Sequence, residues 1–163
     1  MIVSCAALIL ALLNTVGGKI FTLTEDCSAP AGRPALTIKT VFVRTVTINA
    51  QGRTIRGIVF DGGGNLTIRG GRIEAPSGVG TDGSVGYPSN YGVLMKKSAQ
   101  NVALEGVTFI NARKTIVFGD GSSGLVVRNS RCHGAVEDCL IAGGGSSIEF
   151  SNNVAGPFET KPT

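Results

Sequence analysis

Short segments in which apolar and variable residues alternate recur at a fixed step along the chain. Three of them begin 23 residues apart, because 124 − 101 = 23 and 147 − 124 = 23; they are Asn101-Val-Ala-Leu-Glu-Gly, Gly124-Leu-Val-Val-Arg-Asn and Ser147-Ile-Glu-Phe-Ser-Asn. An earlier copy begins at Asn65, and the Gly/Ser/Pro-rich loop 75–90 accounts for its larger distance from Asn101. Alternation over a few residues is the period of a half-buried β-strand, and a constant step of this size indicates a repeat architecture.

Each repeat contains three such strand segments. In one repeat they begin at Gly92, Asn101 and Thr108. No repeat contains the helical run of about 10 residues that a βαβ unit needs. Three strands in a coil of about 23 residues give the geometry of a parallel β-helix, in which each strand pairs with its equivalent one coil away. We therefore predict an all-β fold, a right-handed parallel β-helix.

The alternation also predicts which side chains point into the solenoid. On the first strand of each coil they are Ile58, Phe60, Val93, Met95, Ile116, Phe118, Leu140 and Ala142. On the second and third strands they are Leu66, Ile68, Val102, Leu104, Leu125, Val127, Ile148, Phe150, Ile73, Phe109, Cys132 and Ala155. A shift of one residue would exchange the two faces. The outward residues of the first strands form an apolar stripe that we expect loop 75–90, a longer parent chain or a partner subunit to cover: Val59, Leu94, Val117 and Ile141.

Glycine and asparagine occupy the bend between the second and third strands. The aligned residues are Gly70, Gly106, Asn129 and Asn152. A tight bend needs a positive φ, which these two residue types adopt at least cost. We also predict that the side-chain amides of Asn129 and Asn152 bond to each other in a ladder.

The apolar N-terminal segment 2–13 has two interpretations. As a signal peptide it has a suitable hydrophobic region and small residues near Gly17, although no Lys or Arg precedes Lys19. As a helix capped by Ser4 and ended by Gly17 and Gly18, with a strand at residues 20–23 after it, it would cover the first coil. The segment is too short for a membrane span.

We divide the chain into a capping helix with first strand (1–23) and an incomplete β-helix (24–163). We expect a longer parent chain or a homo-oligomer to cover the last coil.

Composition excludes several classes of protein. The chain has 24 glycines, no tryptophan, 42% hydrophobic and 16% charged residues, a balance opposite to that of disordered chains. The net charge of +4 is spread along the chain and only 6% of the residues are aromatic, which argues against nucleic-acid binding. The four cysteines lack metal-ligand spacing, so we predict no metal site. They are small buried side chains, with a Cys132–Cys139 disulfide across one turn as the alternative for that pair.

The run from Gly92 to Phe109, GVLMKKSAQNVALEGVTF, resembles the right-handed β-helix repeat of the pectate-lyase-like superfamily. The resemblance covers about Val46 to Pro157. It implies a polysaccharide-related function and an extracellular, cell-surface or virion-associated location, because the superfamily includes lyases, hydrolases, tailspikes and adhesins. Its lyases use Ca²⁺ held by clustered carboxylates with an Arg or Lys base, and its hydrolases use aspartates on neighbouring coils.

Candidate catalytic residues surround the single histidine. His133 points outward beside Arg131, with Glu137 and Asp138 on the next turn, and such a cluster can exchange protons or bind an acidic sugar. Candidate substrate-binding residues are hydrogen-bonding, sugar-stacking or cationic: Asp82, Tyr87, Asn90 and Tyr91 of the long loop, and Lys96, Lys97 and Arg128.

The usual catalytic strand has an apolar outer row, and no row of carboxylates crosses the coils. Asp61 and Asp120 each precede or adjoin glycine in turns, where aspartate commonly has a structural role. The sequence therefore favours a β-helix that binds polysaccharide or glycan without catalysis. The alternative is a pectate-lyase-like lyase or glycoside hydrolase acting on acidic polysaccharide, with Ca²⁺ as its cofactor if it is a lyase.

Overall fold

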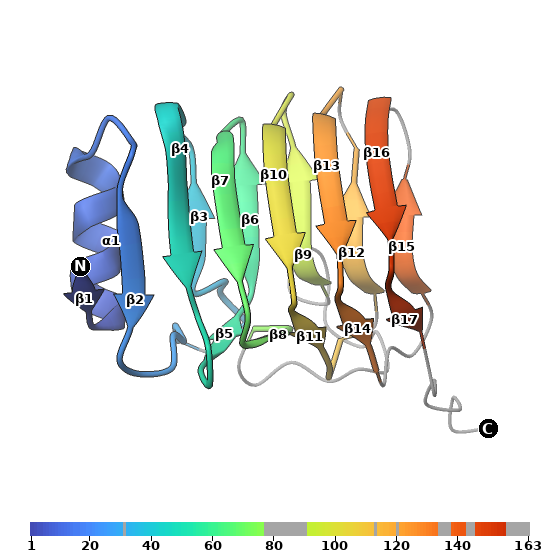
Figure 1. Cartoon of the computed structure of the whole chain (residues 1–163), viewed down its shortest axis with the longest axis horizontal. Helices are drawn as coiled ribbons and strands as arrows, with labels where there is room; N and C mark the ends of the chain where they lie inside the picture. The colour runs from blue at the N-terminus through green and yellow to red at the C-terminus, as the bar shows by residue number, and fades with distance from the viewer. Residues whose placement is uncertain are drawn as a thin grey trace.

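The chain folds into a stack of β-coils with a helix at its N-terminal end (Figure 1). The computed structural model describes residues 1–30, 32–76, 91–112, 114–119, 121–133, 138–142 and 146–155. Within these residues the strands form three sheets, and all of their pairings are parallel. The predicted β-helix with an N-terminal helix is therefore confirmed.

Each sheet collects one strand from every coil, and we number the sheets by the strand's order in the repeat. Sheet 1 contains β3 (Leu36–Ile38), β6 (Ile58–Asp61), β9 (Tyr91–Lys96), β12 (Lys114–Phe118) and β15 (Asp138–Ala142). Sheet 2 contains β1 (Ile2–Val3), β2 (Ile20–Leu23), β4 (Val41–Asn49), β7 (Gly64–Arg69), β10 (Gln100–Glu105), β13 (Ser123–Arg128) and β16 (Ser146–Ser151). Sheet 3 contains β5 (Thr54–Arg56), β8 (Arg72–Glu74), β11 (Thr108–Phe109), β14 (Arg131–Cys132) and β17 (Val154–Ala155).

The register confirms the predicted repeat. Leu125 pairs with Val102 on one side and Ile148 on the other, so the step is 125 − 102 = 23 and 148 − 125 = 23 residues. Val102 also pairs with Leu66, a step of 102 − 66 = 36 residues that contains the long loop. Side chains that recur at the repeat step therefore stack above one another.

The predicted inward side chains form one continuous core. All of those on sheets 1, 2 and 3 from Ile58 to Cys132 are buried. Burial decreases at the last coil, where Leu140 is half-buried and Ile148 and Phe150 remain 37% and 42% exposed, because no described strand follows β16. Ala155 is exposed for the same reason, and the side chain of Ala142 lies outside the described residues.

Much of the outward apolar stripe of sheet 1 is covered. Val59 and Leu94 are buried, and Val117 is half-buried. The side chain of Ile141 lies outside the described residues. The continuous core contains Ile58, Phe60, Val93 and Met95 but neither Val59 nor Leu94, so the predicted inside and outside assignments are correct and the one-residue shift is wrong.

Positive φ recurs at equivalent points of successive coils, two of which bear on the predictions. Gly70, Gly106, Asn129 and Asn152 all have φ between +51° and +67°, as predicted for the bend between sheets 2 and 3. The starts of the sheet 2 strands have it as well, at Asn65, Asn101, Gly124 and Ser147.

An amide ladder lies at the second of these points, not at the first, where the sequence predicted it. Asn101 Nδ2 donates to Asn65 Oδ1 over 3.0 Å, and Asn65 Nδ2 donates to the carbonyl of Phe42. No described hydrogen bond joins the side chains of Asn129 and Asn152, so that prediction is wrong. At the start of a sheet 2 strand the asparagine side chain reaches back to the preceding coil, which is the geometry that a ladder needs.

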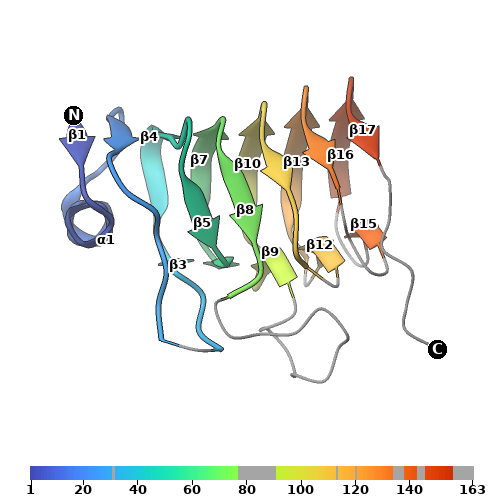
Figure 2. The same ribbon diagram turned by 90° about the horizontal axis from the view of Figure 1, so that it is seen from below.

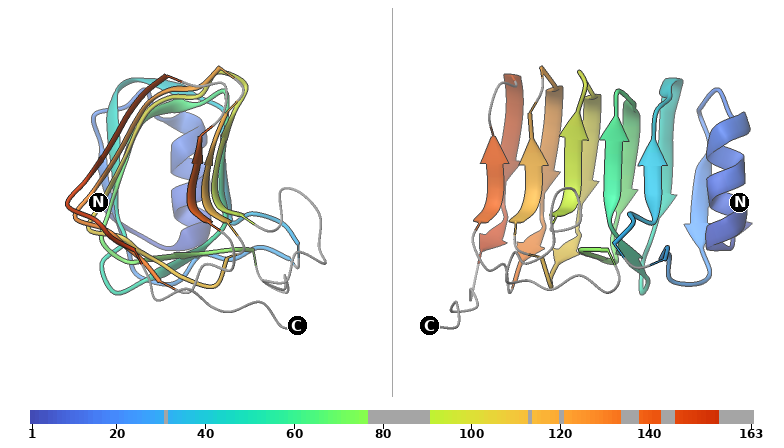
Figure 3. Two further views of the ribbon diagram at one scale, coloured as in Figure 1. Left: turned by 90° about the vertical axis from the view of Figure 1, so that its right-hand side faces the viewer. Right: turned by 180° about the vertical axis from the view of Figure 1, so that it is seen from behind.

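The helix α1 (Cys5–Asn14) lies across the open end of the first coil (Figure 3, left). Ser4 is its N-cap, with Oγ accepting from the Ala7 amide at 3.2 Å, as the sequence predicts. One face, formed by Cys5, Leu8 and Leu12, is buried. Among the described residues no helix is both long and apolar enough to cross a membrane.

The helix ends at Asn14, with Thr15 as its C-cap, earlier than the predicted glycines. Gly17 has another role, because a Cβ there would lie 2.0 Å from the carbonyl oxygen of Arg44. The glycine therefore allows the chain leaving α1 to approach β4 closely.

Two disulfides join all four cysteines. The Cys132–Cys139 bond confirms the alternative considered for that pair. The Cys5–Cys27 bond is not expected from the sequence, which treats both as small buried side chains; it links α1 to the fully buried Cys27, whose backbone bridges to Ile55 of β5. The cap is thus attached covalently to the first coil of sheet 3.

Candidate functional site

The outer side of sheet 3 carries most of the chemistry that the described residues bring together. Its strands are short, and the inward residues of the first four of them (Ile55, Ile73, Phe109 and Cys132) are all buried. The residues that alternate with them therefore point outward. These residues, which we call the sheet 3 face, are Thr54, Arg56, Arg72, Glu74, Thr108, Arg131 and His133.

The first row of this face contains unpaired arginines. Thr54 pairs with Arg72, Arg72 with Thr108, and Thr108 with Arg131. Since neighbouring strands lie about 4.8 Å apart, Arg72 and Arg131 are about 10 Å apart along the solenoid axis. Both are exposed, and no described carboxylate forms an ion pair with either. Two cationic groups without a described ion pair therefore lie two coils apart in this row.

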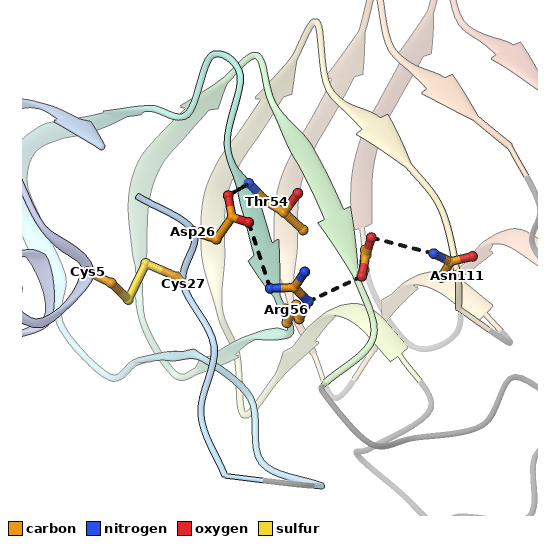
Figure 4. Close-up of polar contacts among 7 residues, drawn as sticks. Cys5, Asp26, Cys27, Thr54, Arg56 and Asn111 are labelled. Atoms are coloured by element: carbon orange, nitrogen blue, oxygen red, sulfur yellow. Dashed lines mark hydrogen bonds and ion pairs between the residues drawn. A yellow bond between two sulfur atoms is a disulfide. The ribbon is translucent and has the colours of Figure 1, made fainter. Parts of the chain in front are cut away.

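The second row is a chain of paired polar groups (Figure 4). Arg56 lies between two carboxylates, with Nε 3.4 Å from Glu74 Oε2 and Nη1 4.0 Å from Asp26 Oδ2. Asn111 Nδ2 donates to Glu74 Oε1 at 3.5 Å, and the Thr54 amide donates to Asp26 Oδ1 at 2.8 Å. Each carboxylate thus has a cation and a second donor. The charges of the second row are therefore paired with one another. The net positive charge of the face comes from the arginines of the first row.

A polar groove of about 450 Å³ begins where sheet 2 turns into sheet 3. Arg53 and Arg72 line it together with Asp26, Gln51, Thr54 and Thr108. Gly52, Gly71 and Gly106 also line it. A Cβ at Gly52 or Gly106 would meet nothing within 4 Å, so these two glycines leave open space above the backbone. The groove combines that open floor with guanidinium groups, which bind planar carboxylates through two parallel hydrogen bonds.

The predicted catalytic cluster is described only in part. Arg131 and His133 lie on the sheet 3 face, both exposed, and the backbone amide of His133 donates to the carbonyl of Phe109 at 2.8 Å. Glu137 lies outside the described residues. Asp138 is the first residue of β15, but its side chain lies outside the description. The cluster therefore stays a prediction, with two of its four members shown on one face.

The predicted substrate-binding residues fall in separate places. Asp82, Tyr87 and Asn90 lie outside the described residues. Tyr91 begins β9 and is half-buried.

The cationic candidates lie at opposite ends of the sheet 2 strands. Lys96 ends β9, and Lys97 follows it with Nζ 3.2 Å from Asp61 Oδ1. Both lie at the corner between sheets 1 and 2, away from Arg131. Arg128 ends β13 at the corner where the groove begins, and its Nη2 is 3.6 Å from Glu149 Oε2.

The sequence missed three contributors to this site. Arg72 precedes the predicted inward residue Ile73, so the alternation places it outward on a third strand. Arg53 and Asp26 lie in coils that precede the clear repeats. The alternation of inward and outward residues could have revealed this row. It makes the outward residues Thr54, Arg72, Thr108 and Arg131 equivalent from coil to coil.

The described residues do not fit a calcium site. They contain no group of three His, Cys, Asp or Glu side chains that could hold a metal ion. The two carboxylates on this face, Asp26 and Glu74, both pair with Arg56. The described part of the face therefore lacks the carboxylate cluster that calcium-assisted proton abstraction requires.

The fold can also be compared with known proteins. No family model, no curated protein and no solved structure matches the chain. The chain is therefore assigned by its own architecture, as a parallel β-solenoid with an N-terminal helix.

Proposed function

We propose that the chain is a β-helix of the pectate-lyase-like type that binds an acidic polysaccharide on its sheet 3 face without cleaving it. The observation that carries the proposal is the row of unpaired arginines beside the glycine-floored groove. Arg53, Arg72 and Arg131 can each meet a sugar carboxylate, and Thr108, between Arg72 and Arg131, can bond to a sugar hydroxyl. The arginines follow the solenoid axis, so a polymer along this axis can contact several of them together.

The affinity comes from repetition. An exposed ion pair contributes only about 0.2–1 kcal/mol, so one guanidinium does not hold a sugar. Several pairs along one polymer add, because the first contact raises the effective concentration of the next carboxylate. Binding of this kind weakens with added salt, since ions screen exposed charges. The two disulfides support an extracellular or surface location, where such polymers occur and disulfides persist.

The test compares acidic with neutral polymers. Polygalacturonate and alginate are titrated against the chain by calorimetry, with uncharged dextran in parallel and the salt concentration varied. Arg72→Gln and Arg131→Gln should each weaken binding to the acidic polymers about 2- to 5-fold, the loss of one exposed pair. Arg44→Gln is the matched control, because it removes the same charge from an exposed position on β4. Equal affinity for dextran, or equal effects of all three variants, would refute the proposed site.

The enzyme alternative is tested in the same samples. A lyase releases unsaturated uronates, which absorb in the ultraviolet, and a hydrolase releases reducing ends. We expect neither product from polygalacturonate or alginate, with or without calcium. Product that disappears in His133→Gln would replace the binding proposal with the catalytic one.

A further inference from the structure

The two arginines in the first row of the sheet 3 face are separated by a coil that carries no charge in this row. Figure 2 shows β5, β8 and β17 of this sheet following one another along the solenoid axis. In the order of the coils, the row contains Thr54, Arg72, Thr108, Arg131 and Val154. The two cations are therefore about 10 Å apart along the axis, with a threonine between them.

The coil between the two arginines has room for an uncharged group. Gly106 and Thr108 are the residues of this coil that line the polar groove, and a Cβ at Gly106 would meet nothing within 4 Å. Glu105 precedes them, but its Oε2 is 3.1 Å from Arg69 Nε, so its charge is already paired. The Thr108 hydroxyl can both donate to and accept from a sugar hydroxyl. This coil therefore suits a neutral sugar better than a charged one.

The separation of the arginines can be compared with the repeat of a polysaccharide. An extended chain of pyranose sugars advances for each sugar by about the 4.8 Å that separates neighbouring strands. Two coils therefore correspond to two sugars. A polymer in which uronates alternate with uncharged sugars brings one carboxylate to each arginine and a neutral sugar to Thr108. A polymer of uronates alone also brings a carboxylate to Thr108, where no cation of the row meets it.

We propose that the sheet 3 face selects acidic polysaccharides in which a carboxylate recurs at every second sugar. This inference rests on the proposed function and adds a required spacing of charges to it. Arg72 and Arg131 each bind one carboxylate through two parallel hydrogen bonds. The second contact forms within the same polymer, so it strengthens binding only if a carboxylate lies within reach once the first is bound. Arg53 lies outside the row, because the residue of its coil that pairs with Arg72 is Thr54.

Two pairs of substitutions test the spacing, because each moves one arginine along the row without changing the composition of the chain. Thr108→Arg with Arg131→Thr reduces the separation from two coils to one, and Arg131→Val with Val154→Arg increases it to three. The strand spacing makes these separations about 5 Å and about 14 Å. Because Val154 is 58% exposed, the second pair keeps the test decisive if the half-buried Thr108 does not accept arginine.

The assay compares two acidic polymers on the native chain and both variants. Hyaluronan, in which glucuronate alternates with N-acetylglucosamine, and polygalacturonate are titrated by calorimetry at equal carboxylate concentration and equal salt. The readout is the ratio of the affinity for hyaluronan to that for polygalacturonate. We expect this ratio to fall about 2- to 5-fold in each variant, which is the loss of one exposed ion pair with the alternating polymer. Circular dichroism checks that each variant keeps the fold.

The possible outcomes separate the selectivity from the binding itself. An equal ratio in all folded proteins would overturn the selectivity, because the affinity would then depend on the number of cations and not on their spacing; the proposed binding site would stand. A higher ratio in either variant would overturn it as well. If the native chain binds neither acidic polymer more tightly than dextran, the proposed function fails and the selectivity fails with it.

Discussion

The Cys5–Cys27 disulfide is the part of the fold whose contribution can be worked out most directly. It joins the first residue of α1 to the buried Cys27, and the two are 22 residues apart in the sequence. Removing it leaves α1 held by the packing of Leu8 and Leu12, by the hydrogen bond from the Cys5 amide to Glu25 Oε1 and by the pairing of β1 with β2. The double variant Cys5→Ser with Cys27→Ser is the appropriate perturbation, because it leaves no free thiol to exchange with the other bond.

The magnitude follows from loop closure in the unfolded chain. For a loop of 22 residues the chain-entropy relation gives about 3.4 kcal/mol at 25 °C. The Cys132–Cys139 loop spans only 7 residues, and the same relation gives about 2.4 kcal/mol. The two double variants should therefore lose stability in that order, with a difference of about 1 kcal/mol.

The assay is urea unfolding followed by circular dichroism, with the free energy of unfolding taken from curves of equal slope. In thermal unfolding a loss of about 3 kcal/mol lowers the midpoint of a chain of this size by about 6–12 °C. A loss below 1 kcal/mol for the Cys5/Cys27 variant, or a larger loss for the Cys132/Cys139 variant, would refute the reasoning. The first outcome would show that the cap is held by packing, and the second that the loop lengths do not set the order.

Two further predictions concern the coils themselves. Phe60→Ala should cost about 3–5 kcal/mol of unfolding free energy, because Phe60 is fully buried, whereas Phe150→Ala should cost less than half as much, since Phe150 is 42% exposed at the last coil; equal losses would contradict the described end of the core. Asn101→Ala should cost about 1–3 kcal/mol, because it removes the bond to Asn65 and places alanine at φ +53°, and Asn101→Gly should recover the backbone part of that loss. If alanine and glycine are equally destabilising in urea titrations, the cost lies in the amide bond alone.

The local pattern predicted the interior because burial in a solenoid is decided strand by strand. Phe60 and Ile68 each alternate with outward residues, and the coil geometry repeats that choice without reference to distant segments. The Cys5–Cys27 bond could not be predicted in this way, since it depends on how the chain between α1 and β3 passes sheet 3. Asp26 was missed for the same reason, because it reaches Arg56 from that passage rather than from a repeat.

The misplaced amide ladder has a different cause. Asn101 and Asn129 both sit in Gly/Asn columns of the repeat, and both have positive φ. The sequence shows that both sets of equivalent Gly/Asn positions tolerate a left-handed backbone. It does not show which of these asparagine side chains points toward the preceding coil. That direction is decided by the start of the sheet 2 strand, where Asn65 and Asn101 reach back along the axis.

The longer step between Leu66 and Val102 has a consequence for how such a molecule can diversify. The pairing of β7 with β10 keeps the same register as that of β10 with β13, although the intervening chain is 36 − 23 = 13 residues longer. The extra residues are inserted between Glu74 at the end of β8 and Tyr91 at the start of β9. The number of residues between β8 and β9 can therefore change without changing the register of the strands. Natural variants or designed grafts could change the sequence here, next to the charged rows of sheet 3, and give one scaffold new recognition without refolding it.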